Sequence, residues 1–254
     1  MKLSGYICAS NAVKFDYCLE LAARSLLPVV DELILCDNDS EDGTALIMQR
    51  LASEYPLKVV LLNYDKPIPV NRQTWWVEWL NWVRDRCSYR MQITLDADEV
   101  LDDTPECHAA VLEAAAKGEC RWFERLNFWQ DGRHLIPDGA CCGKWVARLG
   151  PTDLWMPSDE PITKDPRIRA MATRHPDLRI FHLGFLRCTT AFYAKSKVVQ
   201  PAFLGTYDPR LTAGEAEGKT LAEIPFEWQK NLVEYTGTHP AGVEQWITER
   251  TTTP

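Results

Sequence analysis

The sequence predicts an α/β protein with a mixed, mostly parallel sheet that is flanked by helices. In the first part of the chain, short apolar runs suited to buried strands alternate with amphipathic stretches of helical period. Strands that alternate with helices of this length indicate βαβ units, in which neighbouring strands run parallel. Acidic residues directly follow two of the apolar runs, and ligands of such sheets bind beyond the carboxyl ends of the strands.

The first four predicted strands are separated by three predicted helices. The strands are expected at residues 6–9, 33–36, 59–62 and 91–95, and the helices at residues 15–26, 44–54 and 71–86. In the last of these helices, one apolar stripe is formed by Trp75, Trp76, Trp79, Leu80 and Val83. We interpret this stripe as a core face, which the periodicity favours over an aromatic platform for a ligand.

After about residue 105 the strict alternation of strands and helices ends. Further helices are expected at residues 105–117 and 190–199, and further strands at residues 121–129, 144–149 and 178–183. Residues 130–142 are predicted to form a loop, and the Pro- and Asp-rich residues 151–166 an irregular segment. Residues 206–254 are predicted to form a polar extension with one amphipathic piece near residues 243–248.

The composition is that of an ordinary globular protein, with 46% hydrophobic and 25% charged residues. The net charge of -8 argues against nucleic acid as the main partner, because proteins that bind phosphate backbones normally carry a basic face. The nine cysteines contain no CxxC pair, so we expect reduced thiols, several of them buried as small apolar residues. No apolar run approaches the ~20 residues of a membrane helix, and no signal-peptide pattern is found, which predicts a cytoplasmic protein without a transmembrane segment.

Two acidic clusters, at residues 37–44 and 96–99, follow apolar strands. In an extended strand, residues two apart point the same way, so Asp96 and Asp98 are expected to project together at the mouth of the sheet. Adjacent carboxylates raise each other's pKa, and a hard divalent cation such as Mg²⁺ or Mn²⁺ relieves their repulsion. On a diphosphate, such a cation stabilises the departing negative charge. The alternative is a solvated turn with an aspartate as helix cap.

The segments VDELILCDNDSEDGT at residues 30–44 and LDADEVL at residues 95–101 together resemble the family 2 glycosyltransferases, which have a GT-A fold. The resemblance covers residues 3–105 well and residues 120–200 loosely. It implies a nucleotide-sugar-binding half at residues 1–105, an acceptor-binding and catalytic half at residues 106–205, and a C-terminal extension at residues 206–254. It also implies metal-dependent transfer of a sugar from a UDP- or GDP-type donor to an acceptor hydroxyl, with inversion at the anomeric carbon.

The resemblance implies donor-binding roles by position. Asp37 would contact the nucleotide base, the end of the first strand would line the base and ribose pocket, and Asp96 would meet the ribose or the metal ion. The implied donor residues are Ala9, Ser10, Asn11, Asp37, Arg72, Asp96 and Lys195. For Lys195 the spacing alone leaves open a phosphate contact or a solvated helix face. The family often has a Glu where this chain has Ala12.

The resemblance further implies that Asp96, Asp98 and His182 hold the Mn²⁺ or Mg²⁺ ion. His182 follows an apolar run in IFHLGF, a segment that resembles a later family element whose histidine completes the metal site, although a lone histidine is more often structural. Inversion needs a general base beyond the donor sugar. The order of elements favours Glu160, with Asp159 as second choice, and an exposed acidic loop is the alternative.

Two other classes of protein remain open. A metal-dependent nucleotidyltransferase would use the same sheet and paired aspartates, but such enzymes usually carry a Gly-rich basic loop that residues 4–14 lack. A non-catalytic protein that binds sugar nucleotides or glycans would keep the fold without turnover. The expected partners are a nucleotide-sugar donor and a hydroxyl-bearing acceptor such as a glycan or a lipid-linked glycan, with nucleic acid as a less favoured acceptor.

Overall fold

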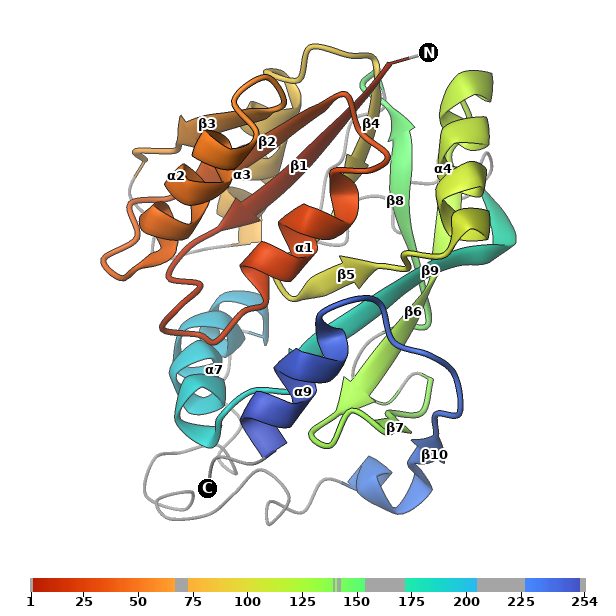
Figure 1. Ribbon diagram of the computed structural model, residues 1–254. Helices are drawn as coiled ribbons and strands as arrows, with labels where there is room; N and C mark the ends of the chain where they lie inside the picture. The colour runs from red at the N-terminus through yellow and green to blue at the C-terminus, as the bar shows by residue number, and fades with distance from the viewer. Residues whose placement is uncertain are drawn as a thin grey trace.

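The computed structural model describes residues 2–66, 73–138, 140, 143–153, 172–204 and 227–251. Within these residues the strands form one ten-stranded sheet in the order β10-β7-β6-β8-β4-β1-β2-β3, with β5 and β9 paired beside this path. Figure 1 shows helices on both sides of the sheet. The predicted α/β class with a mixed, helix-flanked sheet is confirmed.

The first four strands run parallel in the order β4-β1-β2-β3. They are β1 (Leu3–Ala9), β2 (Glu32–Asp37), β3 (Val59–Asn63) and β4 (Met91–Thr94). The connecting helices are α1 (Leu19–Leu26), α2 (Thr44–Glu54) and α3 (Gln73–Arg84). All residues of β1 are buried, because the helices cover both faces of the sheet at this point.

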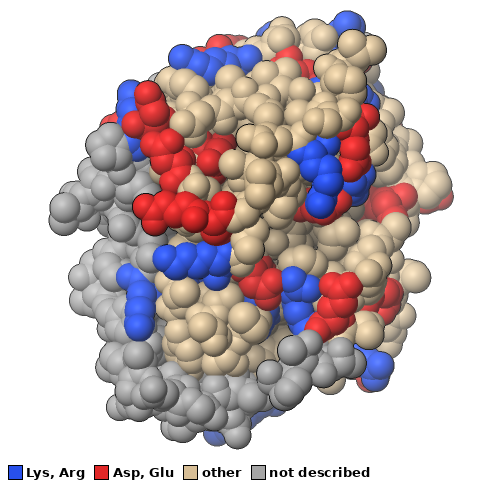
Figure 2. Space-filling view, turned by 60° about the vertical axis from the view of Figure 1, so that its left-hand side comes forward, with Lys and Arg blue, Asp and Glu red and all other residues tan. Residues whose placement is uncertain are grey.

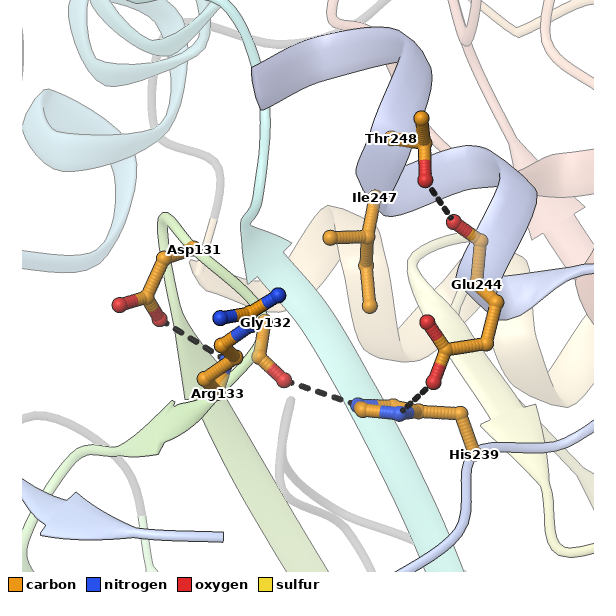
Figure 3. Close-up of a pocket in the computed structure, with 7 residues that line it drawn as sticks. All are labelled: Asp131, Gly132, Arg133, His239, Glu244, Ile247 and Thr248. Carbon is orange, nitrogen blue, oxygen red and sulfur yellow. Dashed lines mark hydrogen bonds and ion pairs between the residues drawn. The ribbon is translucent and has the colours of Figure 1, made fainter. Parts of the chain in front are cut away.

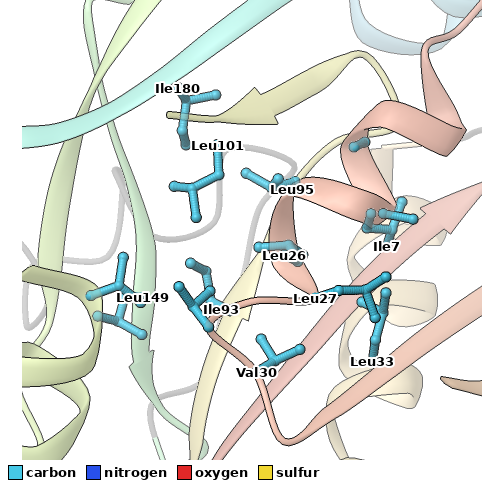
Figure 4. Packing of buried hydrophobic residues seen from close by; sticks show 14 of the residues in the cluster. Ile7, Leu26, Leu27, Val30, Leu33, Ile93, Leu95, Leu101, Leu149 and Ile180 are labelled. Atoms are coloured by element: carbon cyan, nitrogen blue, oxygen red, sulfur yellow. The ribbon is translucent and has the colours of Figure 1, made fainter. Parts of the chain in front are cut away.

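Alternate strand residues face two different layers of the core, as the period of a strand requires. On one face, Ile7 and Leu33 pack in a cluster with Leu26 of α1, and Figure 4 shows these side chains gathered beside that helix. On the other face, Tyr6 packs in a second cluster with Trp79 of α3. The helices therefore pack against the central strands from both sides.

The tryptophan stripe of α3 is a core face, as predicted. Trp79 and Val83 have no exposed surface, and Leu80 is 6% exposed. Trp76 is partly buried against the same cluster. The prediction is confirmed for these residues, while the side chain of Trp75 lies outside the described part of the chain.

The second half of the chain adds a largely antiparallel region. Its elements are β5 (Glu99–Leu101), α4 (Pro105–Lys117), β6 (Arg121–Trp129), β7 (His134–Leu135), β8 (Trp145–Pro151), β9 (Thr173–Phe185) and α7 (Thr189–Leu204). Strand β8 runs antiparallel to β4 and to β6. Strand β9 runs parallel to β6 and antiparallel to β5, so it links the short strand after β4 to the antiparallel strands of the second half.

Helix α4 carries sequence signals at both ends. The side chain of Thr104 caps its start by accepting a hydrogen bond from Cys107 N at 3.3 Å, and Pro105 occupies the first turn. Gly118 ends the helix with a φ of 70°, a left-handed conformation that glycine adopts without a steric penalty. These signals explain why the predicted bounds of this helix agree with the structure.

The C-terminal segment folds back onto the sheet. It contains a 3-10 helix (Glu227–Asn231), β10 (Val233–Glu234) and α9 (Val243–Thr251). Strand β10 pairs with β7. The predicted amphipathic piece is helix α9, whose Val243 and Ile247 are buried in a cluster with Phe128 of β6 and Phe181 of β9.

A pocket of about 460 Å³ lies between the turn that joins β6 to β7 and this C-terminal segment. Figure 3 shows the ring of His239 at its wall, with Nε2 2.9 Å from Gly132 O and Nδ1 2.8 Å from Glu244 Oε1. A Cβ atom at Gly132 would lie 2.4 Å from Ile247 Cδ1, so only glycine allows this close approach. The pocket is lined by Asp131, Gly132, Arg133, His239, Glu244, Ile247 and Thr248.

Some element bounds differ from the prediction. Strand β9 begins at Thr173 rather than at residue 178, because its first residues pair with β6 although they are exposed and polar. Strand β5 has only three residues, too few to show a strand period in the sequence. Strand β7 lies inside the predicted loop at residues 130–142. The predicted irregular segment at residues 151–166 lies mostly outside the described residues.

Charged side chains of both signs are mixed on the surface of the protein (Figure 2). On the face drawn in Figure 2, acidic and basic side chains lie close to one another instead of forming a continuous basic strip. The cysteines that the structure describes are free thiols, and most of them are buried. A search of the described helices finds none with the length and apolar character needed to cross a bilayer.

Candidate functional site

The candidate site lies beyond the carboxyl ends of β1, β2 and β4. Strand β2 pairs with one side of β1 and β4 with the other. The connections therefore diverge at β1, and such a switch point is where open α/β sheets bind ligands. Ala9 at the end of β1 lies opposite Asp37 at the end of β2, which brings two of the predicted donor residues together.

The loops that follow β1 and β2 are joined by hydrogen bonds. Asn11 N donates to Ser40 Oγ at 2.8 Å, and Ala12 N donates to Thr44 Oγ1 at 2.7 Å. The Ser40 hydroxyl in turn donates to Asp37 Oδ1, and Ser40 N donates to Asp37 Oδ2 at 3.1 Å. Asn11 has a φ of 53°, a left-handed conformation that asparagine tolerates better than most residues. Both loops are therefore held in one defined arrangement before any ligand binds.

The predicted donor residues at these loops are partly accessible. Ser10, Asn11 and Asp37 are half-buried, whereas Ala9 is buried. Ser10 Oγ donates to a backbone oxygen of the second loop, that of Asn38, at 3.3 Å. The structure thus brings together the four residues predicted from the first strand and the first acidic cluster.

The expected extended geometry at Asp96 and Asp98 is wrong. Strand β4 ends at Thr94, and the following residues form a turn closed by a hydrogen bond from Glu99 N to Asp96 O at 3.0 Å. Asp96 Oδ2 accepts from Arg148 Nη2 at 2.6 Å, while Asp98 turns to other partners. The carboxylates therefore do not project side by side from a strand, because the backbone reverses between them.

Glu99 anchors this turn from inside the protein, a role that the sequence did not reveal. Its side chain has no exposed surface. Glu99 Oε2 accepts from Asp96 N at 3.0 Å, and Oε1 accepts from Arg148 Nη2 at 2.8 Å. Arg125 Nη1 lies 3.6 Å from the same Oε1 atom. Two buried arginines thus compensate a buried carboxylate, and Arg148 links Glu99 to Asp96.

Two cations meet one oxygen of Asp98. Arg187 Nη2 donates to Asp98 Oδ2 at 2.8 Å, and Lys195 Nζ donates to the same atom at 2.9 Å. Burial alone would raise the pKa of Asp98, but the charges of Lys195 and of its other neighbours outweigh burial and hold this pKa well below its usual range. The two ion pairs therefore favour the ionised form of Asp98, and Lys195 lies in the site rather than on a solvated helix face.

Tyr17 lies beneath both cations. Its ring centroid is 4.8 Å from Arg187 Cζ and 4.9 Å from Lys195 Nζ, the geometry of cation–π contacts. Arg187 Nη1 also donates to Phe15 O at 2.8 Å, and the Arg187 side chain has no exposed surface. The segment after β1 thus contacts both cations, through the ring of Tyr17 and the backbone oxygen of Phe15, and holds them beside Asp98.

His182 lies on β9 next to Asp98. Its Nδ1 atom is 2.9 Å from Asn127 Oδ1, an acceptor, so Nδ1 carries the proton and Nε2 the lone pair. Burial lowers the pKa of His182 to about 3, which keeps the ring neutral. Its Nε2 atom lies 3.8 Å from Asp98 Oδ1. A Cβ atom at Gly184 would lie 2.4 Å from Nε2, so a glycine is needed there.

Asp98 and His182 each offer an atom that can bind a divalent metal ion. The lone pair of His182 Nε2 and the Asp98 Oδ1 atom face each other, and imidazole nitrogen with carboxylate oxygen suits Mn²⁺. Asn127 holds the ring as outer-shell partners of metal-binding histidines do. No group of three or more potential ligands is assembled among the described residues. Asp98 and His182 thus offer two atoms that suit a metal ion, while Asp96 is bound to Arg148, and the predicted metal site stays a prediction.

Three predicted site residues, Arg72, Asp159 and Glu160, lie outside the described residues. Among the described residues, the sequence interpretation missed the side chains that compensate the site's charges. They are Glu99, Arg125, Asn127, Arg148 and Arg187. One signal was present, since Arg148 stands alone within an otherwise apolar strand run, where an arginine needs a buried anion.

A scan against protein-family models finds no match, and a search of curated proteins finds none either. Among solved structures, the chain is similar to TarS of S. aureus, with a TM-score of 0.50 and 11% identity over 86% of this chain and 44% of that one. At this identity the likeness establishes the fold alone. The fold is of the GT-A type, as the sequence resemblance implied.

Two further structures are similar at lower scores. A mannosyltransferase from Pyrobaculum calidifontis, in complex with GDP-Man and Mn²⁺, has a TM-score of 0.46 and 17% identity over 71% of this chain and 56% of that one. A glucose-1-phosphate thymidylyltransferase from Bacillus anthracis has a TM-score of 0.46 and 10% identity over 72% of this chain and 90% of that one. The chain spans less than half the length of TarS.

Proposed function

We propose that this chain is a glycosyltransferase of the family 2 type, which moves a sugar from a UDP- or GDP-type donor to an acceptor hydroxyl with inversion. One observation carries the proposal. Beyond the end of β4, at the switch point of a GT-A sheet, the anion Asp98 is grouped with His182, Lys195 and Arg187. An anion that fits a metal ion, beside two cations, is complementary to a metal-bound diphosphate.

We expect the donor to bind across two parts of this site. The nucleoside would bind against the joined loops after β1 and β2, where Asp37 offers a fixed carboxylate to base N–H groups. Lys195, which is partly exposed, would face the diphosphate, and the buried charge of Arg187 would lie behind it. Because their charges are held in a largely buried setting, they would stabilise the negative charge that grows on the leaving group more strongly than solvated cations do.

A divalent metal ion would be held by Asp98 and His182, with Asp96 as a further candidate ligand. When bound, such an ion neutralises charge on the diphosphate. Two neighbouring residues position His182 for this role. Asn127 keeps the lone pair of His182 Nε2 directed at the site, and Gly184 leaves room for the ring.

In the transfer step, the acceptor oxygen forms a bond to the anomeric carbon as the bond from that carbon to the diphosphate oxygen breaks. The bonding electron pair leaves with the nucleoside diphosphate. The acceptor proton passes to a carboxylate on the other side of the sugar, for which we propose Glu160 or Asp159. Attack opposite to the leaving group inverts the anomeric centre.

The first test is binding. Thermal unfolding of the protein is measured with UDP, GDP, other nucleoside diphosphates and their sugar conjugates, with Mn²⁺ or with EDTA. A ligand that binds only the folded state stabilises it by about 2.7 kcal/mol at a hundredfold excess over Kd. We expect one nucleotide to raise the unfolding midpoint in a metal-dependent way. If none does, the donor site and the proposed function are wrong.

The second test is turnover with the nucleotide that binds. Release of nucleoside diphosphate from the sugar nucleotide is expected from a glycosyltransferase, whereas formation of pyrophosphate from a nucleoside triphosphate and a sugar phosphate would identify a nucleotidyltransferase instead. Asp98→Asn should abolish the release. Asp153→Asn is a matched control, because Asp153 forms an exposed ion pair with Arg90. Full activity of Asp98→Asn would exclude the metal-binding role of Asp98.

A further inference from the structure

The C-terminal helix α9 is joined to the first loop of the donor site by a bidentate ion pair. Arg250 Nη2 lies 2.5 Å from Asp16 Oδ1, and Arg250 Nε lies 3.1 Å from both Asp16 oxygens. The two side chains are 19% and 18% exposed, so the pair is largely shielded from water. A bidentate arginine–carboxylate pair fixes distance and orientation together.

Asp16 also binds the segment that carries Arg187. Asp16 Oδ2 accepts a hydrogen bond from Cys188 N at 3.2 Å. Asp16 itself has a φ of 51°, a left-handed conformation that is uncommon for residues other than glycine, with aspartate and asparagine as the usual exceptions. One carboxylate thus ties three segments together, namely the loop after β1, the turn before α7 and helix α9.

The neighbours of Asp16 in the sequence touch the cations of the site. Phe15 O accepts from Arg187 Nη1 at 2.8 Å, and the ring of Tyr17 lies beneath Arg187 and Lys195. A displacement of Asp16 would therefore move the Phe15 oxygen that binds Arg187 and the Tyr17 ring that contacts both cations.

We propose that Arg250 is a positioning residue of the donor site. Through Asp16, it holds Phe15 and Tyr17 so that Arg187 stays paired with Asp98 and Lys195 faces the diphosphate of the donor. This inference rests on the proposed function, and it gives the C-terminal segment a part in donor binding. Helix α9 is then a component of the site rather than an appendage of the catalytic domain.

The competing explanation is that the ion pair only anchors the helix. Apolar contacts already do this, because Val243 has no exposed surface and Ile247 is 8% exposed. Removal of the ion pair alone therefore leaves the helix with its apolar anchor. The two explanations differ in their effect on nucleotide affinity, which an anchor far from the cations does not change.

The test compares the affinity of Arg250→Met and of the parent protein for the nucleoside diphosphate that the parent binds, measured by titration calorimetry. We expect Arg250→Met to raise the Kd of the diphosphate by about tenfold, since small misplacements of charged groups have effects of this size or larger. The Kd of the corresponding nucleoside monophosphate should rise less. Arg250→Lys, which keeps the charge but not the fork, should recover part of the loss.

Two variants separate positioning from stability. Val243→Ala should lower the unfolding midpoint through the apolar anchor and leave the Kd unchanged. Asp16→Asn removes the same ion pair by changing its other partner. Asparagine tolerates the left-handed backbone at this position, so this variant replaces Arg250→Met if Arg250→Met does not fold. An unchanged Kd in Arg250→Met or Asp16→Asn, or an equal loss in Val243→Ala, would overturn this inference alone. Failure of the parent protein to bind any nucleotide would overturn the proposed function and this inference with it.

Discussion

Asn127 Oδ1 accepts a hydrogen bond from His182 Nδ1 at 2.9 Å, and this one contact decides which nitrogen of the ring faces Asp98. The two residues are register partners on the parallel strands β6 and β9. The pairing of two strands therefore sets the tautomer of the site's histidine.

If this contact orients a metal ligand, its loss should weaken metal binding. We expect Asn127→Ala to lower the affinity for Mn²⁺ by about 10- to 100-fold, the range typical of lost outer-shell partners. Titration of the purified protein with Mn²⁺, followed by electron paramagnetic resonance, measures it. Asn63→Ala is the control, because Asn63 is an exposed residue bonded to Asp39. Equal Mn²⁺ affinities of Asn127→Ala and Asn63→Ala would show that Asn127 does not support metal binding.

Gly184 leaves the space that the ring of His182 fills. In Gly184→Ala the new Cβ atom would meet His182 Nε2 at 2.4 Å, so the ring must move away from Asp98. We expect release of nucleoside diphosphate to fall by about a hundredfold, as for other small displacements of reacting groups. Gly143→Ala is the matched control, since its nearest contact is 3.8 Å. Retention of activity in Gly184→Ala would show that the position of His182 does not matter.

Arg148 compensates two carboxylates. In Arg148→Met, Glu99 loses its closest cation and Asp96 loses its ion pair. Breaking a buried pair by removing one partner costs about 3–5 kcal/mol of stability, and we expect a loss in this range. Urea denaturation measures it. Arg90→Met, which breaks an exposed pair with Asp153, should change stability by less than about 1 kcal/mol.

The neutral ring of His182 makes stability depend on pH. Because its pKa is lowered from 6.5 to about 3, the unfolded chain takes up a proton below pH 6.5 that the folded chain does not take up. This contribution is complete above the unfolded pKa and declines as the pH falls through this window. In the parent protein, the free energy of unfolding should therefore fall by up to about 1.4 kcal/mol per pH unit between pH 6 and 5 because of His182. We expect His182→Gln to lose this part of the slope.

The protein for this measurement is kept metal-free with EDTA, so that only protons bind the ring. Urea denaturation at several pH values gives the slope for the parent protein and for His182→Gln. The window lies above the range in which solvated carboxylates titrate, so Asp98 contributes little to it. Equal slopes in the two proteins would mean that His182 is charged in the folded state.

The parts of the fold that were predicted from the sequence are those with a period. The stripe of α3 at Trp79, Leu80 and Val83 repeats as a helix requires, and its burial follows from that pattern. Strand β5 has three residues and no such pattern, because its pairing with β9 is a tertiary event. The turn at Asp96 was missed for the same reason, since its closure depends on the buried side chain of Glu99.

In the candidate site, too, some residues could be predicted from the sequence and others could not. Asp98 and His182 were predicted because motifs carry them, and the structure brings them together. The charges that neutralise Asp98 come from Arg187 and Lys195, which are 89 and 97 positions away in the sequence. No local pattern links such residues, so only the folded chain shows that Asp98 faces cations.

The ion pair between Asp16 and Arg250 spans 234 positions of the chain. A ribosome makes proteins from the N-terminus at about 5–20 residues per second, and early segments begin to fold before late ones exist. The parallel strands from β1 to β4 can assemble while the chain is still being synthesised, but the loop around Asp16 gains its last partner only after α9 has emerged. If the chain binds a sugar nucleotide as proposed, its donor site is therefore completed only after α9 has left the ribosome.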